Sequence, residues 1–249
     1  MRIKVIANNA GIFAKVILII QTIKQYCTNN NVSLSEVSSI YLESTPNSID
    51  NLFDYVLEQE KFDSYDVVLQ ADYSIKTSIR MSESPDLKFL YYIFDKVKIK
   101  GSVLERVNPN INENTIGVHI RLTDMNTLHK NEYGVRNFGQ YLNKINSVIK
   151  ETENSNIFIA SDNAESIVKL EGEYDIITNI ISNRHNSEID TGNQYNNFLR
   201  LNHLSENFWV DSFLDMLSLA KCGYLIKGVS SLSTTSIVKS DTIKKVYYV

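Results

Sequence analysis

Residues Thr115–Asp124 read T-I-G-V-H-I-R-L-T-D, and the fold that we expect for the rest of the chain is built around this segment. It begins as a buried strand, because Ile116, Val118 and Ile120 are apolar and the segment is bounded by turn-forming residues. Open α/β sheets bind their ligands outside the carboxyl ends of the strands. The residues at the end of this strand are therefore the first candidates for a functional site.

The end of the strand carries polar side chains, at His119, Arg121 and Asp124. An arginine there presents a planar fork of donors that suits a phosphate, and its guanidinium keeps its charge. The alternative is an edge strand whose arginine is only a solvated charge. This stretch alone leaves both interpretations open.

Composition limits the possible classes of protein. The 249 residues suffice for one large domain or two small ones, and a 43% apolar content supports a real core. The net charge of −4 argues against a broad nucleic-acid surface, so we predict no nucleic-acid partner. Cys27 and Cys222 lack metal-binding spacing, which predicts reduced core residues.

No segment of the sequence indicates a membrane span. The apolar run Ala10–Ile20 is interrupted by Lys15 and is too short to cross a bilayer. A strand-like segment precedes the run and no small-residue cleavage site follows it, which argues against a signal peptide. We therefore expect a cytoplasmic protein with no integral membrane segment.

The first half of the chain alternates strands with helices. The expected strands are Ile3–Ala7, Val37–Leu42 and Asp66–Ala71, and the expected helices are Ile12–Tyr26, Ser48–Glu58, Asp86–Ile99 and Gly101–Val107. Gly11 belongs to the turn after the first strand, where the helix N-terminus could bind an anion or sugar hydroxyls; an ordinary turn is the alternative. We predict domains at 1–107 and 115–249, joined by a polar linker at 108–114.

The second half alternates more regularly. After the opening strand, further strands are expected at Asn156–Ala160, Tyr174–Thr178, Tyr224–Lys227 and Ile243–Val249. Helices are expected at Phe138–Thr152, Ala164–Leu170, Phe208–Cys222 and Ser233–Ser240, with a long loop at Ile181–Asn207. Such alternation predicts an α/β fold with mostly parallel sheets and right-handed crossovers.

Two further strand ends carry polar residues, Ser161-Asp162-Asn163 and Val229-Ser230-Ser231. If these strands neighbour the opening strand, the three polar turns meet at one edge. A serine pair at a strand-to-helix turn suits a phosphate, although capping of the next helix is the alternative, as it is for Asp162. Lys227 could reach the same phosphate or be solvated.

Asp211 and Asp215 lie one helical turn apart and share a face. A carboxylate there could accept hydrogen bonds from N1–H and N2–H of guanine; a solvated helix face is the alternative. The histidines at 129, 185 and 203 have no ligand spacing, so we predict neither a metal site nor a cofactor.

Three segments of this half resemble a known family. They are H-I-R-L-T-D at His119–Asp124, I-F-I-A-S-D at Ile157–Asp162, and the stretch Asp215–Ser231. In order and spacing they resemble the motifs of the α-1,6/α-1,2/protein-O-fucosyltransferase superfamily, above all the α-1,6-fucosyltransferases and nodulation fucosyltransferases. The resemblance covers about Thr115–Lys239.

This resemblance implies a GT-B fold, with two Rossmann-like domains whose mostly parallel sheets face a central cleft. It also implies inverting, metal-independent transfer of fucose from GDP-fucose to a glycan or glycoconjugate acceptor. The first domain would then serve the acceptor side and the second the nucleotide sugar.

The resemblance also implies roles for single residues. Arg121 would bind the β-phosphate, His119 would lie beside it, and Asp215 would recognise guanine. The other implied donor-binding positions are Ser231 with Ser230 on the phosphate, Asp162 of the second motif, and the Gly11 turn facing the donor sugar.

The sequence departs from the family at two points. Leu122 replaces a second arginine that is common in the first motif. For the family's base, Glu132 is the nearest match, with Asp124 and His129 as rivals. We therefore predict Arg121, Glu132 and Asp124 as the catalytic set, and keep a catalytically silent sugar- or nucleotide-binding module, or a transferase using another nucleotide sugar, as alternatives.

Overall fold

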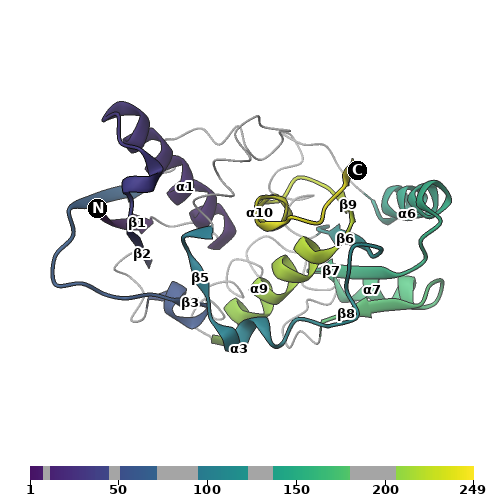
Figure 1. The fold of residues 1–249 in the computed structure, drawn as a ribbon. Coiled ribbons are helices and arrows are strands. Elements are labelled where there is room, and N and C mark those ends of the chain that lie inside the picture. The colour runs from purple at the N-terminus through teal and green to yellow at the C-terminus, as the bar shows by residue number, and fades with distance from the viewer. Residues whose placement is uncertain (8–11, 45–50, 72–94, 123–136, 180–205) are drawn as a thin grey trace. The chain divides into compact units, whose positions relative to one another are not determined.

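A computed structural model of the chain describes residues 1–7, 12–44, 51–71, 95–122, 137–179 and 206–249. The chain forms two compact units, Met1–Glu105 and Arg106–Val249. Each has its own parallel sheet with helices packed on it (Figure 1). Each unit is therefore α/β with a parallel sheet, which confirms the predicted fold class.

The first unit is built on a three-stranded parallel sheet of order β2-β1-β4. Its strands are β1 (Arg2–Ala7), β2 (Ser39–Ser44) and β4 (Val67–Ala71). The helix α1 (Ile12–Asn29) follows β1, and its side chains Leu18, Ile19 and Ile23 are almost fully buried. Shorter elements complete the unit: η1 (Leu34–Glu36), η2 (Leu52–Tyr55), α3 (Gly101–Leu104), and an antiparallel pair of β3 (Leu57–Glu58) with β5 (Lys98–Ile99).

Two of the helices predicted for this unit are wrong in their described parts. Within Ser48–Glu58 the chain forms the 3-10 helix η2 and then β3, because Leu57 pairs with Ile99 and Phe53 and Val56 are fully buried. The end of the predicted helix Asp86–Ile99 is the strand β5 for the same reason. Residues 48–50 and 86–94 lie outside the described residues. Tertiary pairing outweighs local propensity here.

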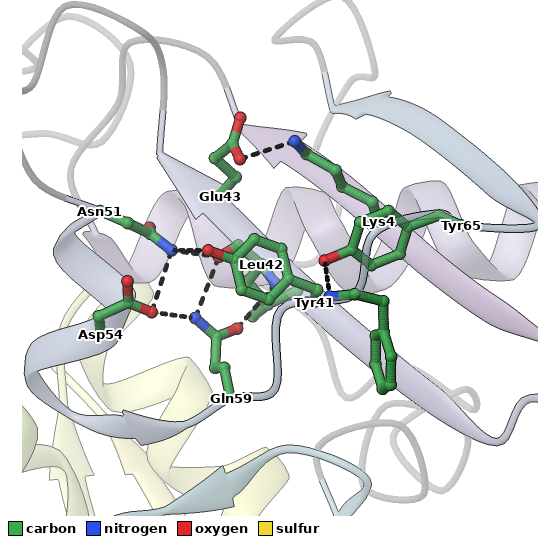
Figure 2. Close-up of polar contacts among 9 residues, drawn as sticks. Lys4, Tyr41, Leu42, Glu43, Asn51, Asp54, Gln59 and Tyr65 are labelled. Carbon is green, nitrogen blue, oxygen red and sulfur yellow. Dashed lines mark hydrogen bonds and ion pairs between the residues drawn. The ribbon is translucent and has the colours of Figure 1, made fainter.

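Strand β2 is an edge strand, and a side chain completes its hydrogen bonding (Figure 2). Gln59 accepts a hydrogen bond from the Leu42 amide at 2.7 Å and donates one to the Leu42 carbonyl at 3.1 Å, as a neighbouring strand would. Asn51 donates to the same carbonyl at 2.8 Å. A Lys4–Glu43 ion pair of 2.7 Å joins β1 to β2. The contacts of Gln59 and Asn51 satisfy backbone groups of Leu42 that a free edge would expose.

The second unit contains a five-stranded parallel sheet of order β10-β9-β6-β7-β8. The strands are β6 (Ile116–Ile120), β7 (Ile157–Ser161), β8 (Ile176–Thr178), β9 (Tyr224–Lys227) and β10 (Lys245–Tyr248). The helices are α6 (Phe138–Thr152), α7 (Ala164–Glu171), α9 (Glu206–Lys221) and α10 (Ser231–Lys239). The parallel arrangement predicted from alternation is confirmed.

The helices of this unit cover opposite faces of the sheet (Figure 1). Side chains of α6 and α7 pack with the alternate β6 residues Ile116, Val118 and Ile120. Side chains of α9 and α10 pack on the other face, with Phe158, Ala160 and Leu225. Because successive residues of a strand point to opposite faces, Gly117 faces α9. A Cβ built on Gly117 would lie 3.1 Å from the side chain of Leu219, so the absence of a side chain lets α9 lie close to β6.

Element boundaries differ slightly from those expected. The α6 bounds agree with the prediction, because an Asn137–Gln140 capping box fixes its start. α10 begins at Ser231 rather than Ser233, and α9 begins at Glu206. Residues 108–114, predicted as a linker, lie in the second unit, where Ile111 is 3% exposed and packs in the core.

Candidate functional site

The three polar turns follow neighbouring strands of the second unit. In the sheet register, His119 on β6 is level with Ala160 on β7 and with Lys227 on β9. Because all three strands are parallel, their carboxyl ends lie at one edge of the sheet. The predicted side-by-side arrangement of these strand ends is therefore confirmed.

Two basic side chains lie next to each other at this edge. His119 and Lys227 are register partners, so they point to the same face of the sheet, which is the face covered by α9 and α10. They are only 6% and 2% exposed. The interpretation of Lys227 as a solvated side chain is wrong.

The side chains after β6 diverge. Arg121 is half-buried. Leu122 instead packs against the core that α6 forms with β6. The position that carries a second arginine in the family motif therefore contributes to the hydrophobic core.

The first turn of α10 forms the most specific feature of the edge. Ser230 occupies the N-cap position with extended backbone angles (φ −162°, ψ 136°), yet its side chain makes no capping hydrogen bond. Its hydroxyl Oγ is buried and has no hydrogen-bond partner among the described residues. The capping alternative is therefore confirmed for the position of Ser230, but its hydroxyl does not act as the cap.

The backbone around Ser230 is arranged as in an anion site. The Ser230 carbonyl accepts from the Thr234 amide at 3.1 Å, so the amides of Ser231, Leu232 and Ser233 precede the first hydrogen bond of the helix. Such amides carry the positive end of the helix dipole. With the Ser230 hydroxyl beside them, they offer donors to a phosphate.

Asp162 follows β7 and is half-buried. The N-cap of the next helix, α7, is Asn163, whose Oδ1 accepts from the Ser166 amide at 2.8 Å. The capping alternative for Asp162 is therefore wrong.

The two carboxylates of α9 have different surroundings. Asp215 is 5% exposed, and its Oδ1 accepts a hydrogen bond from Nδ2 of Asn179 at 2.9 Å. Asp211 is 4% exposed and forms an ion pair of 3.3 Å with Arg106. Neither lies on a solvated helix face, so that alternative is wrong for both.

Three predicted site residues, Gly11, Asp124 and Glu132, lie outside the described residues, as does the rival base His129. Within the described ranges, no group of three or more His, Cys, Asp and Glu side chains is arranged to hold a metal ion. The same ranges hold no helix long and apolar enough to cross a membrane.

Two further residues of this edge, Asn179 and Thr234, are not among those predicted from the sequence. Asn179 follows β8 directly and holds Asp215, so the rule that singled out the other strand ends could have found it. Thr234 lies one turn after Ser230 and bonds to its carbonyl at 2.8 Å. No sequence signal distinguishes Thr234 from the other hydroxyl residues of α10.

The chain is similar to known proteins in its fold and not in its sequence. No family model and no curated protein sequence matches the chain. Among solved structures, a NodZ α-1,6-fucosyltransferase co-crystallized with GDP has a TM-score of 0.57 at 13% identity, over 94% of this chain and 91% of the other.

Two more solved structures agree. The fucosyltransferase NodZ from Bradyrhizobium has a TM-score of 0.52 at 14% identity, over 98% of this chain and 94% of the other. A mutant of Arabidopsis thaliana FUT1 in complex with GDP has a TM-score of 0.53 at 11% identity, over 98% and 70%. The chain therefore has the GT-B fucosyltransferase-type fold, with Rossmann-like units.

Proposed function

We propose that the chain transfers fucose from GDP-fucose to a hydroxyl group of a glycan or glycoconjugate, with inversion and without a metal ion. The observation that carries the proposal is the Ser230 hydroxyl, buried and without a partner among the described residues, at the N-terminus of α10. It follows the strand that neighbours β6, the strand of His119 and Arg121. This is the edge at which the fold binds ligands.

In the proposed reaction, GDP leaves C1 of fucose and negative charge develops on its β-phosphate. Arg121 donates charge-assisted hydrogen bonds to that phosphate. The Ser230 hydroxyl and the Ser231 amide donate from the other strand end. Donors that are already oriented stabilise the developing charge without reorganisation.

Asp215 gives the site its preference for guanine. One of its oxygens accepts from Asn179, which fixes the carboxylate, and a carboxylate has about four acceptor positions. In the proposed complex, the same carboxylate accepts from N1–H and N2–H of guanine. Uracil lacks this pair of donors, so UDP-sugars bind poorly.

The general base of the proposed reaction follows β6 in the sequence. Glu132, with Asp124 as its rival, removes the proton of the acceptor hydroxyl as that oxygen attacks C1 from the face opposite GDP. The new O–C1 bond forms while the bond from C1 to the phosphate oxygen breaks, so the configuration at C1 inverts. The transition state has oxocarbenium character, as in glycoside hydrolysis.

A catalytically silent binding module is the second candidate. It is favoured by Leu122, a partly buried residue that packs against the hydrophobic core at the position where a second phosphate-binding arginine would be expected. Such a module would bind GDP-fucose and leave it intact.

Release of GDP from GDP-fucose, measured with EDTA present and without acceptor, separates the two candidates. The transferase hydrolyses the donor slowly, and Arg121→Ala abolishes this release. Of the two variants Glu132→Gln and Asp124→Asn, the one that removes the general base lowers transfer to a glycan acceptor and leaves GDP binding unchanged. Tight donor binding with no GDP release, in the presence of candidate glycan acceptors as well, would establish the silent module.

A further inference from the structure

Lys227 is the most deeply buried charged side chain at the edge described above. It is the last residue of β9 and is 2% exposed. Moving an ammonium group out of water is costly unless hydrogen bonds or opposite charges compensate for it. The contacts that the Lys227 ammonium group makes therefore bear on its role in this position.

The contacts of Lys227 connect it to the first turn of α10. Its Nζ donates to Oγ1 of Thr234 at 2.9 Å, and Oγ1 of Thr234 donates to the Ser230 carbonyl at 2.8 Å. Thr234 thus accepts with a lone pair and donates with its proton, which uses a hydroxyl in both senses. The chain Lys227–Thr234–Ser230 links the ammonium group to the residue that presents the buried Ser230 hydroxyl.

We propose that Lys227 is a positioning residue of the diphosphate site: it holds the first turn of α10 against β9 and adds a fixed positive charge behind it. This inference rests on the proposed nucleotide-sugar function. In it, Lys227 supplies the second positive charge that is missing because Leu122 stands in place of an arginine. His119, level with Lys227 on the neighbouring strand, adds a second basic group to the same face.

Electrostatics makes this role specific for phosphate. A charge in a site that excludes water acts through a low effective dielectric constant, so its attraction for an anion is much stronger than at the surface. Lys227 therefore strengthens the binding of the charged diphosphate and not that of the uncharged guanine base. A lysine with only a structural role would affect the binding of both parts of the nucleotide equally.

The test is the affinity of the whole chain for GDP, for guanosine and for inorganic pyrophosphate, measured by calorimetry. Lys227→Met keeps an unbranched side chain that is one atom shorter and removes its charge, and Lys221→Met, on an exposed residue of α9, is the matched control. We expect Lys227→Met to weaken GDP and pyrophosphate binding by about tenfold to a hundredfold and to leave guanosine binding unchanged. Lys221→Met leaves all three unchanged.

A second pair of variants tests the connection itself. Thr234→Val removes the hydroxyl and keeps the shape, whereas Thr234→Ser keeps the hydroxyl. We expect a smaller loss of pyrophosphate affinity in Thr234→Val and recovery in Thr234→Ser. This pair decides the question if Lys227→Met does not fold.

The outcomes separate the two proposals. Wild-type affinity for GDP and pyrophosphate in Lys227→Met, or an equal loss for guanosine, overturns the role of Lys227. If Thr234→Ser restores the affinity for neither GDP nor pyrophosphate, the hydrogen-bonded connection is overturned. Pyrophosphate binding without a preference for GDP over UDP overturns the guanine assignment and leaves Lys227 in place, and a chain that binds neither GDP nor pyrophosphate overturns both.

Discussion

At the scale of single residues, burial distinguishes the functional interpretations from the ordinary ones. The sequence places Ser230, Lys227 and Asp215 after strands or on a helix face, but each also has a common structural explanation. Only the folded chain shows that all three are at most 5% exposed. Their depth depends on α9 and α10 covering one face of the sheet, which no local pattern contains.

Ser230→Ala separates binding from stability. Because the buried Ser230 hydroxyl has no partner among the described residues, its removal does not lower the free energy of unfolding. GDP affinity falls by about tenfold, which corresponds to about 1.4 kcal/mol. Calorimetry with GDP and a denaturant titration measure the two quantities.

Ser233→Ala is the control for this prediction. The Ser233 hydroxyl donates to the Ser230 carbonyl at 3.3 Å, so its removal costs about 0.5–1.5 kcal/mol of stability and leaves GDP affinity unchanged. A Ser230→Ala variant with full GDP affinity would show that the hydroxyl is not a ligand group.

The paired carboxylates of α9 give a second prediction. Asp215→Asn replaces an acceptor with a donor, so the affinity for GDP falls and the preference for GDP over UDP is lost. Asp211→Asn removes the charge that pairs with Arg106 and keeps that preference. Loss of the preference in Asp211→Asn alone would transfer the guanine-binding role to Asp211.

At the scale of elements, the sequence predicts those whose signals are local. The amphipathic pattern and capping box of α6 fix the bounds of that helix. The predicted helix at Ser48–Glu58 fails because Leu57 pairs with a strand that is distant in the sequence, Lys98–Ile99, and local propensity contains no information on that pairing.

Gly223, which joins α9 to β9, permits a close backbone contact. A Cβ built on Gly223 would lie 1.8 Å from the Glu113 carbonyl oxygen, and a backbone atom cannot move aside as a side chain can. Gly223→Ala should therefore lower the free energy of unfolding by about 3 kcal/mol or more. Gly172→Ala, whose Cβ would meet its nearest atom at 3.5 Å, should be nearly neutral. Equal stability of the two variants in urea would contradict this account.

The C-terminal strand β10 is linked to α6 by a pH-dependent contact. The hydrogen bond from Lys245, and secondly that from Tyr247, lowers the pKa of Glu151 from its ordinary value of 4.5. A carboxyl group whose pKa is lower in the folded state stabilises the fold above that ordinary value, and this contribution is lost as the pH falls through the lowered pKa.

Glu151→Gln should therefore melt below the wild type at pH 7, and the difference should shrink as the pH falls below 4.5. The effect is small and weakens with salt, because Glu151 is exposed. Glu171→Gln, on an exposed residue of α7, is the control. A difference in melting temperature that grows on acidification would contradict the sign.

At the scale of the whole molecule, alternation of strands and helices suffices to predict parallel sheets. The order β10-β9-β6-β7-β8 is not available from alternation, because it depends on which side of β6 each crossover takes. The TM-scores of 0.57, 0.53 and 0.52 then confirm the fold at identities of 11–14%, too low to carry function.

The most direct test of the central claim is calorimetric titration of the chain, with EDTA present, against GDP, UDP and GDP-fucose, beside Arg121→Ala and Asp215→Ala. We expect selective binding of GDP and GDP-fucose without a metal ion, with affinity lost in both variants and the folded state retained. Absence of binding by any guanine nucleotide, or equal affinity for UDP, would contradict it.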